Sequence, residues 1–214
     1  MNAPRRLRLF DYWESGNCYK VRLLLSQIGT PFERVHLDIL KGATRTPEFL
    51  KKNNNGRVPV VEWPDGRCLA ESNAILWHLS EDTPFLPEDR WDRAKALQWL
   101  FFEQYSHEPY IAVVRFWHFA NQLEEHRSAL PEKMARGYRA LRVMEEHLET
   151  QAYFAGERYT IADIALYAST HVAEEGAFDI SEFPAIGEWL ERVRAQPGHV
   201  KITENVGELV AWPK

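Results

Sequence analysis

The sequence predicts an α/β domain with a mixed four-stranded sheet, followed by an all-α helical-bundle domain. Apolar and polar residues alternate in short strand-like runs within residues 1–82. There, Asp65-Gly66 separates two such runs, as in a β-hairpin. From residue 91 onward the apolar residues recur at steps of three and four, which is typical of helices. We therefore expect two domains, residues 1–82 and 91–214, joined by a linker over residues 83–90.

The first elements alternate between the strand and the helix period. Leu7 and Leu9 alternate with polar neighbours and predict a strand that ends at Asp11. A helix that ends at Gly29 should follow, with apolar residues at Val21, Leu24, Leu25 and Ile28. A second strand is predicted by the alternation of Val35, Leu37 and Ile39. The order strand, helix, strand favours a right-handed crossover between parallel strands.

A hairpin and a third helix complete the first domain. The hairpin strands are expected over residues 58–62 and 67–71, on either side of Asp65-Gly66. Ser72 comes next, and we interpret it as the N-cap of a helix. The full order, βαβ followed by a connecting segment and then ββα, is thioredoxin-like in outline.

The second domain is predicted from helical stripes and one capping motif. A long helical pattern begins near Trp91. A later helix has one apolar face, formed by Met134, Tyr138, Leu141, Met144 and Leu148. Thr160 and Asp163 form a variant of the capping box, with Tyr159 and Ile164 placed as a hydrophobic staple. These signals indicate a bundle of helices.

Composition limits the classes of function. With 214 residues, 45% of them hydrophobic, and a net charge of -5, the chain resembles neither a disordered protein nor a nucleic-acid binder. Two cysteines, Cys18 and Cys68, fit a reducing compartment better than a disulfide framework. No apolar run forms a signal peptide or approaches the roughly 18 residues of a membrane span. We expect a cytoplasmic protein with no nucleic-acid, membrane or metal partner.

Two short features suit the recognition of an amino acid. Val58-Pro59 lies inside a run that otherwise predicts a strand, and a cis peptide there would expose the Val58 backbone to a ligand. The alternative is an ordinary proline of an edge strand. Glu71 and Ser72 begin the third helix, whose N–H groups could bind a carboxylate while Glu71 holds an ammonium group. The alternative for Ser72 is a capping role alone.

Three segments occur in a characteristic order: NNNGRVPVVE, ESNAILWHLSE and TIADIALYA. Together they resemble the cytosolic glutathione transferase family, and the resemblance covers nearly the whole chain. It implies a cis Val58-Pro59 peptide, with the Val58 backbone paired to the cysteinyl part of glutathione. It also implies that Glu71 and Ser72 hold the γ-glutamyl end, that glutathione is a co-substrate, and that the protein is a homodimer.

Ser15-Gly16-Asn17-Cys18 resembles the serine-type active-site loop of this family, in which a serine replaces the first cysteine of a redox motif. The reactive thiol then belongs to glutathione. Lowering a thiol pKa from about 8.5 to roughly 6.5 needs about 2.7 kcal/mol of preference for the thiolate. A helix N-terminus contributes about 0.3–1 kcal/mol, up to ~2, and a hydrogen bond to a charged group about 1.5–3 kcal/mol. Ser15, just before the first helix, could supply both effects.

Other residues compete with Ser15 or assist it. Asn17 could donate its side-chain amide to the same sulfur and is the second catalytic candidate. Some classes of the family use a tyrosine from this region, but the spacing between Tyr12 and Cys18 fits those classes poorly. Cys18 itself occupies the buried second position of a redox motif. Further glutathione contacts are expected near the glycyl carboxylate from Lys41 and Arg57, either of which could instead be a solvated cation.

A hydrophobic co-substrate is expected against the first long helix of the second domain. The segment WLFFEQYSHEPYIAVVRFWHF is dense in aromatic residues that surround the helix instead of forming one stripe. Tyr105 and Arg115 are the candidates for this electrophile site. The alternative is that the aromatic residues form the core of the bundle.

The leading interpretation is a glutathione transferase that ionises bound glutathione for attack on a small hydrophobic electrophile. Disulfide or peroxide reduction with glutathione is the second interpretation. An isomerase that uses glutathione as a cofactor is suggested by CYKVRLLL. A non-catalytic binding module is also an alternative. The presence of Glu71-Ser72 and Val58-Pro59 argues against it. The identity of the electrophile does not follow from the sequence.

Overall fold

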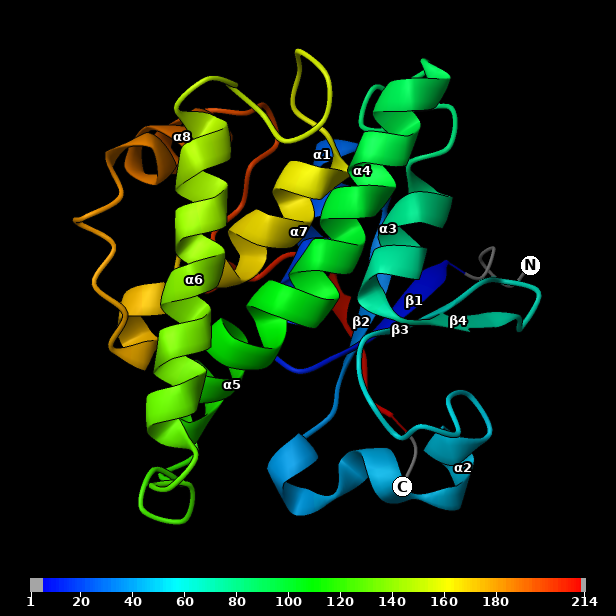
Figure 1. The fold of residues 1–214 in the computed structure, drawn as a ribbon. Helices are drawn as coiled ribbons and strands as arrows, with labels where there is room; N and C mark the ends of the chain where they lie inside the picture. The colour runs from blue at the N-terminus through cyan, green and yellow to red at the C-terminus, as the bar shows by residue number, and fades with distance from the viewer. Residues whose placement is uncertain (1–5, 213–214) are drawn as a thin grey trace. The chain divides into compact units, whose positions relative to one another are not determined.

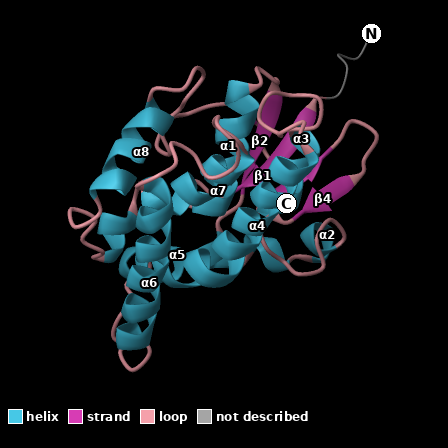
Figure 2. Cartoon of the chain, turned by 45° about the horizontal axis from the view of Figure 1, so that its top comes forward, coloured by secondary structure: helices cyan, strands magenta, loops and turns pink. Residues whose placement is uncertain are grey.

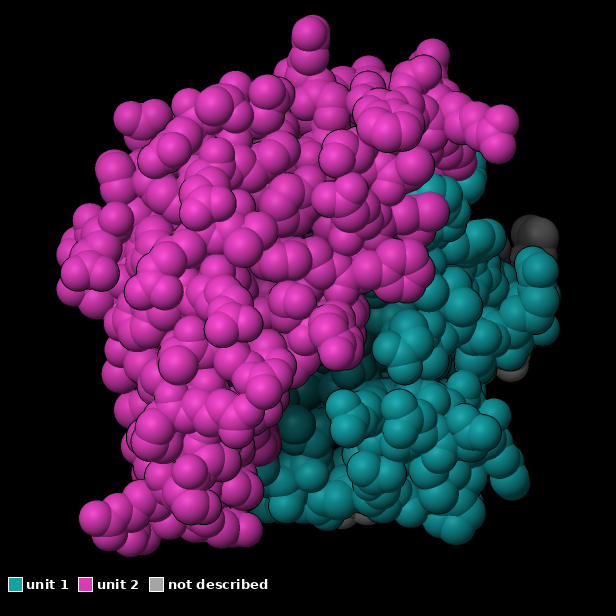
Figure 3. Space-filling model, in the orientation of Figure 1, with its two compact units in different colours: residues 1–83, 197–214 teal, residues 84–196 magenta. Residues whose placement is uncertain are grey.

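A computed structural model describes residues 6–212, which form two compact units. Unit 1 comprises the described residues up to Thr83 together with those from Pro197 onward, and unit 2 is Pro84–Gln196. Figure 1 gives the elements along the chain, and Figure 3 colours the two units. The predicted α/β domain and the all-helical domain that follows it are both confirmed.

Unit 1 is built on a mixed sheet in the strand order β4-β3-β1-β2-β5. Figure 2 shows the strands in magenta. β1 and β2 are parallel and are connected through α1, so the predicted parallel crossover is confirmed. β3 runs antiparallel to both β1 and β4. The elements are β1 (Leu7–Asp11), α1 (Gly16–Gln27), β2 (Phe32–His36), the 3-10 helices η1 (Ile39–Lys41) and η2 (Ala43–Arg45), α2 (Pro47–Leu50), β3 (Val60–Glu62), β4 (Cys68–Ala70), α3 (Ser72–Leu79) and β5 (Glu208–Leu209).

The two faces of this sheet bury different side chains because residues alternate along a strand. On one face the strands pack against α1 and α3 through Leu7, Leu9, Val21, Leu25, Val61 and Ile75. The opposite face packs against α2 through Phe10, Val35, Val60 and Phe49. The helices α1 and α3 therefore lie on one face, where they also contact each other.

The sheet has one strand more than the four expected. β5 pairs in parallel with β2, where Glu208 lies opposite Glu33 and Leu209 opposite Arg34. The described residues from Pro197 onward thus belong to unit 1, whereas residues 91–214 were expected to form the helical domain. Both residues of β5 are exposed, so the strand carries no apolar alternation that a sequence pattern could reveal.

This returning segment is held by long side chains buried in α1. The Tyr19 hydroxyl donates a hydrogen bond to the Val200 carbonyl at 2.6 Å. The Arg22 guanidinium donates to the Ile202 carbonyl at 3.2 Å. Buried donors need acceptors, and the backbone carbonyls of the segment supply them. The segment therefore supplies acceptors for the Tyr19 hydroxyl and for one nitrogen of the Arg22 guanidinium.

Unit 2 is a bundle arranged around α7, whose ten residues are all buried. Its neighbours include α4, α5 and α8. Within residues 6–212, no helix is both long and apolar enough to span a membrane. The elements are α4 (Arg90–Phe102), the π-helix η3 (Glu103–His107), α5 (Glu108–Phe119), α6 (Leu130–Leu148), α7 (Ile161–Thr170), the 3-10 helix η4 (Ala173–Gly176) and α8 (Pro184–Arg194).

The capping box predicted for α7 is confirmed. The Asp163 carboxylate accepts from the Thr160 backbone N–H at 2.9 Å, and the Thr160 hydroxyl oxygen accepts from the helix. The same carboxylate also accepts from Trp189 Nε1 at 3.0 Å and from the Phe154 N–H at 3.2 Å. Burial raises the pKa of Asp163 to about 6, against the opposing effect of these hydrogen bonds. One carboxylate thus connects three segments of unit 2.

We expect Asp163→Ala to lower the free energy of unfolding by about 3 kcal/mol, and Asp89→Ala by about 1 kcal/mol. Both carboxylates cap a helix, but Asp89 is exposed at the start of α4. Loss of Asp163 leaves the buried N–H groups of Trp189 and Phe154 without their acceptor. Urea denaturation followed by circular dichroism measures both values. Equal losses would contradict the role of the buried hydrogen bonds.

Candidate functional site

Ser15 lies at the N-terminal end of α1. It is the N-cap, in an extended conformation, and its Oγ accepts a hydrogen bond from the Cys18 backbone N–H at 3.2 Å. This bond uses an acceptor position of the hydroxyl, which also has a hydrogen to donate. The first N–H groups of a helix and its dipole favour an anion at this end. The position suits a hydroxyl that stabilises a thiolate.

Cys18 cannot serve as an accessible thiolate. The side chain is fully buried, and its Sγ accepts from the Tyr12 backbone N–H at 3.4 Å. Burial raises the pKa of the Cys18 thiol well above its usual range, and the nearby negative charge of Asp11 raises it further. The sequence interpretation of Cys18 as a core residue agrees with this placement.

Tyr12 is also removed from direct competition for a sulfur. Its ring is buried at the end of β1 and stacks on His36 with the ring centroids 5.8 Å apart. Burial raises the pKa of Tyr12 to about 12, and the charges of Glu14 and Asp38 add to this effect. Its hydroxyl also forms a hydrogen bond with Glu14.

The N-terminal end of α3 lies beside that of α1. The Ser72 hydroxyl donates to the Asn17 side-chain carbonyl at 3.0 Å. Ser72 is the first residue inside α3, and the N-cap is Glu71, so the interpretation of Ser72 as the N-cap was wrong. Glu71 has φ 66° and ψ 111°, a backbone conformation that costs free energy for a residue with a side chain. The structure therefore brings together Asn17, Glu71 and Ser72 from the candidate set.

Val58-Pro59 precedes β3, and its peptide bond is cis, as the family resemblance implies. Pro59 is buried and Val58 is half-buried. The loop before it is built by Asn53, whose side-chain amide donates to the Arg57 carbonyl at 2.9 Å and accepts from the Asn55 N–H at 3.0 Å. The first asparagine of NNNG thus shapes the loop that leads to the cis peptide.

The expected cations near the glycyl end have different surroundings. Lys41 is exposed and pairs with Asp38 across 3.0 Å, so it has a local partner. Arg57 is exposed, directly before Val58. The geometry therefore favours Arg57 over Lys41 as a contact for a ligand carboxylate.

Sequence reasoning missed one polar residue at these helix ends, Lys20. Its side chain is fully buried, and its Nζ donates to the Ser72 Oγ and to the Asn73 Oδ1, each at 3.3 Å. Helical spacing places residue 20 on one face with Asn17 and Leu24, but the acceptors that allow its burial lie in α3. A lysine on that face needs hydrogen-bond partners.

The two electrophile-site candidates have different environments within unit 2. Tyr105 is 83% exposed on η3. It lines an open hollow together with Gln98, Phe101, Phe102, Gln104 and Ser106. Arg115 lies on α5 and pairs with Glu175 across 2.6 Å. It is not among the residues that line this hollow.

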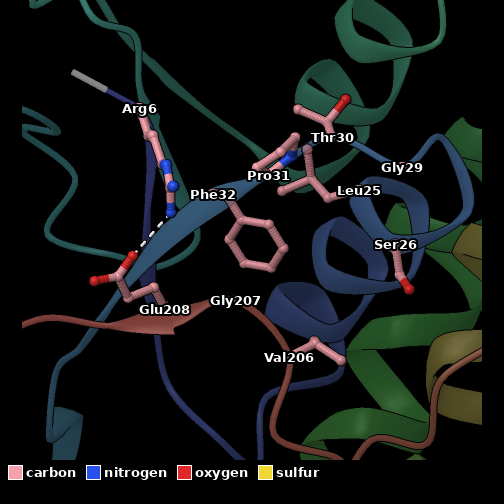
Figure 4. Close-up of a pocket in the computed structure, with 10 residues that line it drawn as sticks. All are labelled: Arg6, Leu25, Ser26, Gly29, Thr30, Pro31, Phe32, Val206, Gly207 and Glu208. Atoms are coloured by element: carbon pink, nitrogen blue, oxygen red, sulfur yellow. Dashed lines mark hydrogen bonds and ion pairs between the residues drawn. The ribbon is translucent and has the colours of Figure 1, made fainter. Parts of the chain in front are cut away.

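A second hollow lies in unit 1, where residues near the C-terminal end of α1 meet β5 (Figure 4). Arg6 and Glu208 form an ion pair at 2.8 Å beside it. The Phe32 ring lies against Gly207, where a Cβ atom would come within 2.5 Å of the ring. Ser15 caps the opposite end of the twelve-residue α1, about 18 Å away along the helix. This hollow is therefore separate from the candidate site.

Among residues 6–212 there is no group of three or more His, Cys, Asp or Glu side chains arranged to hold a metal ion.

Two family models match the chain: the glutathione S-transferase N-terminal domain over residues 5–81 and the glutathione S-transferase C-terminal domain over residues 94–197. The chain belongs to the glutathione S-transferase family. The matched regions correspond to the thioredoxin-like part of unit 1 and to most of unit 2.

Two solved glutathione S-transferases are similar to this chain. One from Pseudomonas fluorescens Pf-5 is 50% identical, with a TM-score of 0.90, and the match covers 92% of this chain and 99% of that one. The other, from Pseudomonas putida, is 28% identical with a TM-score of 0.81 and covers 92% and 90%. That structure has one glutathione disulfide bound per subunit.

Curated relatives in the glutathione S-transferase family have differing activities. The disulfide-bond oxidoreductase YfcG of Escherichia coli strain K12 is 30% identical over 189 residues, 85% of this chain and 87% of the relative. The maleylacetoacetate isomerase of Rhizobium meliloti strain 1021 is 31% identical over 185 residues, 83% and 86% of the two chains. Membership of the family therefore leaves more than one reaction open.

Proposed function

We propose that the protein binds glutathione at the N-terminal ends of α1 and α3 and ionises its thiol for attack on a small hydrophobic electrophile. The single observation that carries this proposal is the geometry of Ser15, a capping hydroxyl at the α1 end beside a cysteine that is buried. A loop without an accessible thiol of its own suits a sulfur that the ligand brings. The glutathione disulfide bound by the Pseudomonas putida relative supports the choice of ligand.

In this proposal each part of glutathione has its own partners. The γ-glutamyl carboxylate binds the N–H groups and the hydroxyl at Ser72, while Glu71 accepts from the ammonium group. The backbone of Val58 pairs with the cysteinyl part. Arg57, and with less support Lys41, contacts the glycyl carboxylate. These contacts place the sulfur near Ser15 and Asn17.

The chemistry then depends on the free energy of thiol ionisation. A hydrogen bond from Ser15 to the sulfur contributes about 1.5–3 kcal/mol, and the helix end about 0.3–1 kcal/mol. Together these bring a thiol pKa of about 8.5 to roughly 6.5. The thiol proton passes to solvent on ionisation, and the thiolate then forms a C–S bond to the electrophile while the leaving group departs with its electron pair. We place the electrophile in unit 2 near Tyr105, whereas the ion pair of Arg115 with Glu175 makes that residue a weaker candidate.

Glutathione-dependent disulfide reduction is the second candidate function. Asn17 is the residue we assign to it, because its amide lies at the α1 end, where its carbonyl oxygen accepts from Ser72. The similarity to a disulfide-bond oxidoreductase gives independent support. An isomerisation that uses the same thiolate is a further alternative, in view of the isomerase relative. A cytoplasmic homodimer is part of the proposal in either case.

A thiolate titration tests the proposed function. Glutathione bound to the protein should show the ultraviolet absorbance of a thiolate with a pKa of roughly 6.5, against about 8.5 for free glutathione. The same preparation should react with an aryl halide faster than it reduces a small organic disulfide. Absence of binding, or a bound thiol with an ordinary pKa, would refute thiol activation. Disulfide reduction alone would favour the second candidate.

A further inference from the structure

Lys20 is a buried ammonium group between α1 and α3. Its side chain is inaccessible to solvent, although lysine is among the residues least often buried. The Nζ atom donates to Ser72 Oγ and to Asn73 Oδ1, each at 3.3 Å, so it bonds the first two residues of α3. A lysine in this position ties the end of one helix to the side of the other.

The direction of these hydrogen bonds follows from donor and acceptor chemistry. An ammonium group only donates, so Ser72 Oγ must accept from Lys20. The one hydrogen of the Ser72 hydroxyl is then directed to Asn17 Oδ1, 3.0 Å away. Asn17 accepts this hydrogen with its side-chain carbonyl oxygen. The bonds form a directed chain from Lys20 through Ser72 to Asn17.

We propose that Lys20 is a positioning residue that orients the Ser72 hydroxyl for the γ-glutamyl carboxylate of glutathione. This inference rests on the proposed binding of that carboxylate at the α3 end. An arriving carboxylate competes with Asn17 for the Ser72 hydrogen, while Lys20 holds the Ser72 oxygen in place. Donation from Lys20 also strengthens donation by Ser72, because hydrogen bonds in a chain polarise one another.

The test compares two ligands that differ only in the group concerned. One is glutathione, and the other is 4-aminobutyryl-cysteinylglycine, which lacks the γ-glutamyl α-carboxylate. For Lys20→Met we expect the Kd of glutathione to rise roughly tenfold and the Kd of the analogue to change less than about twofold. In a Ser72→Ala background, Lys20→Met should have no further effect on glutathione affinity, because the two residues act through one hydroxyl.

Lys52→Met is the matched control. Lys52 is a partly buried lysine of the same unit, paired with Glu62, and its replacement should change neither Kd. Circular dichroism checks that each variant is folded, and Lys20→Gln replaces Lys20→Met if the latter does not fold. A wild-type protein that fails to bind glutathione would refute the proposed function. Normal wild-type binding with equal effects of Lys20→Met on both ligands, or with none, would overturn only the role of Lys20.

Discussion

Ser15→Ala is expected to return the pKa of bound glutathione from roughly 6.5 towards 8.5 and to lower the conjugation rate about 25-fold at pH 7. A thiol with a pKa of 6.5 is about 75% ionised at pH 7, and one with a pKa of 8.5 only about 3%. The difference in rate between the wild type and Ser15→Ala should narrow as the pH rises and disappear at about pH 10, where both thiols are ionised. Rates at saturating glutathione, measured across pH, give this profile.

Two further substitutions on α1 separate catalysis from helix capping. Ser15→Thr keeps both the cap and the hydroxyl and should retain most of the activity. Ser26→Ala changes a serine near the other end of α1 and should leave both the pKa and the rate unchanged. A loss in Ser15→Ala that is independent of pH would contradict thiolate stabilisation by this hydroxyl and would indicate damage to the helix end.

The comparison of Ser15 with Asn17 distinguishes the two candidate functions. For conjugation by the proposed mechanism, Ser15→Ala should reduce the rate more than Asn17→Ala does. If the rate of disulfide reduction persists in Ser15→Ala and falls in Asn17→Ala, the protein is a glutathione-dependent disulfide reductase, the second candidate function. The structure makes this comparison meaningful because the two side chains lie within the same turn of chain, yet only Asn17 is bonded to Ser72.

Local signals in the sequence were sufficient for much of the fold. The alternation at Leu7 and Leu9 predicted β1, and Asp65-Gly66 predicted the hairpin, although its strands are shorter than expected. Thr160 and Asp163 predicted the start of α7. Each of these signals depends on residues close together in the chain, which is why they can be read without the structure.

Features that depend on distant partners could not be predicted in the same way. Lys20 is buried because Ser72 and Asn73 accept its hydrogen bonds from 52 and 53 residues away. Arg22 finds the Ile202 carbonyl 180 residues away. Lys20 and Arg22 both interrupt the apolar pattern of α1. From the pattern alone, both side chains would be predicted to be exposed to solvent. β5 was missed for the same reason, since its two residues pair only with β2.

The break in the first long helix of unit 2 has a local cause, a proline that is visible in the sequence. A single helix was expected from Trp91, but the π-helix η3 separates α4 from α5. Pro109 is the second residue of α5 and lacks the N–H that would bond an earlier carbonyl, and its ring crowds the preceding turn. A wider turn relieves this conflict. The exposed Tyr105 lies in that turn, so the proline also determines where this candidate residue is presented.

The buried charges below the Ser15 loop should dominate the stability of unit 1. Asp11 and Arg22 are both inaccessible to solvent, and Arg22 donates to the two carboxylate oxygens at 2.6 and 2.8 Å. Arg34 lies 3.5 Å from the same carboxylate. Burial lowers the pKa of Arg34, while the charge of Asp11 opposes that effect. Arg22 also donates to the Trp13 carbonyl at 2.8 Å, which holds the loop before Ser15.

Asp11→Asn is therefore expected to lower the free energy of unfolding by about 3–5 kcal/mol. The substitution preserves shape but leaves the guanidinium groups of Arg22 and Arg34 without their shared anion. Glu33→Gln is the control, because Glu33 pairs with the partly exposed Arg8 and should contribute less than about 1 kcal/mol. Urea denaturation measures both losses.

A second substitution tests whether charge is the cause. Adding Arg34→Met to Asp11→Asn removes one of the two uncompensated cations, and the double variant should regain part of the lost stability. If the losses of the two substitutions simply add, the effect of Asp11 arises from packing or hydrogen bonding and not from repulsion between the buried arginines. Partial recovery would show that one carboxylate keeps two buried cations compatible beneath the loop that carries Ser15.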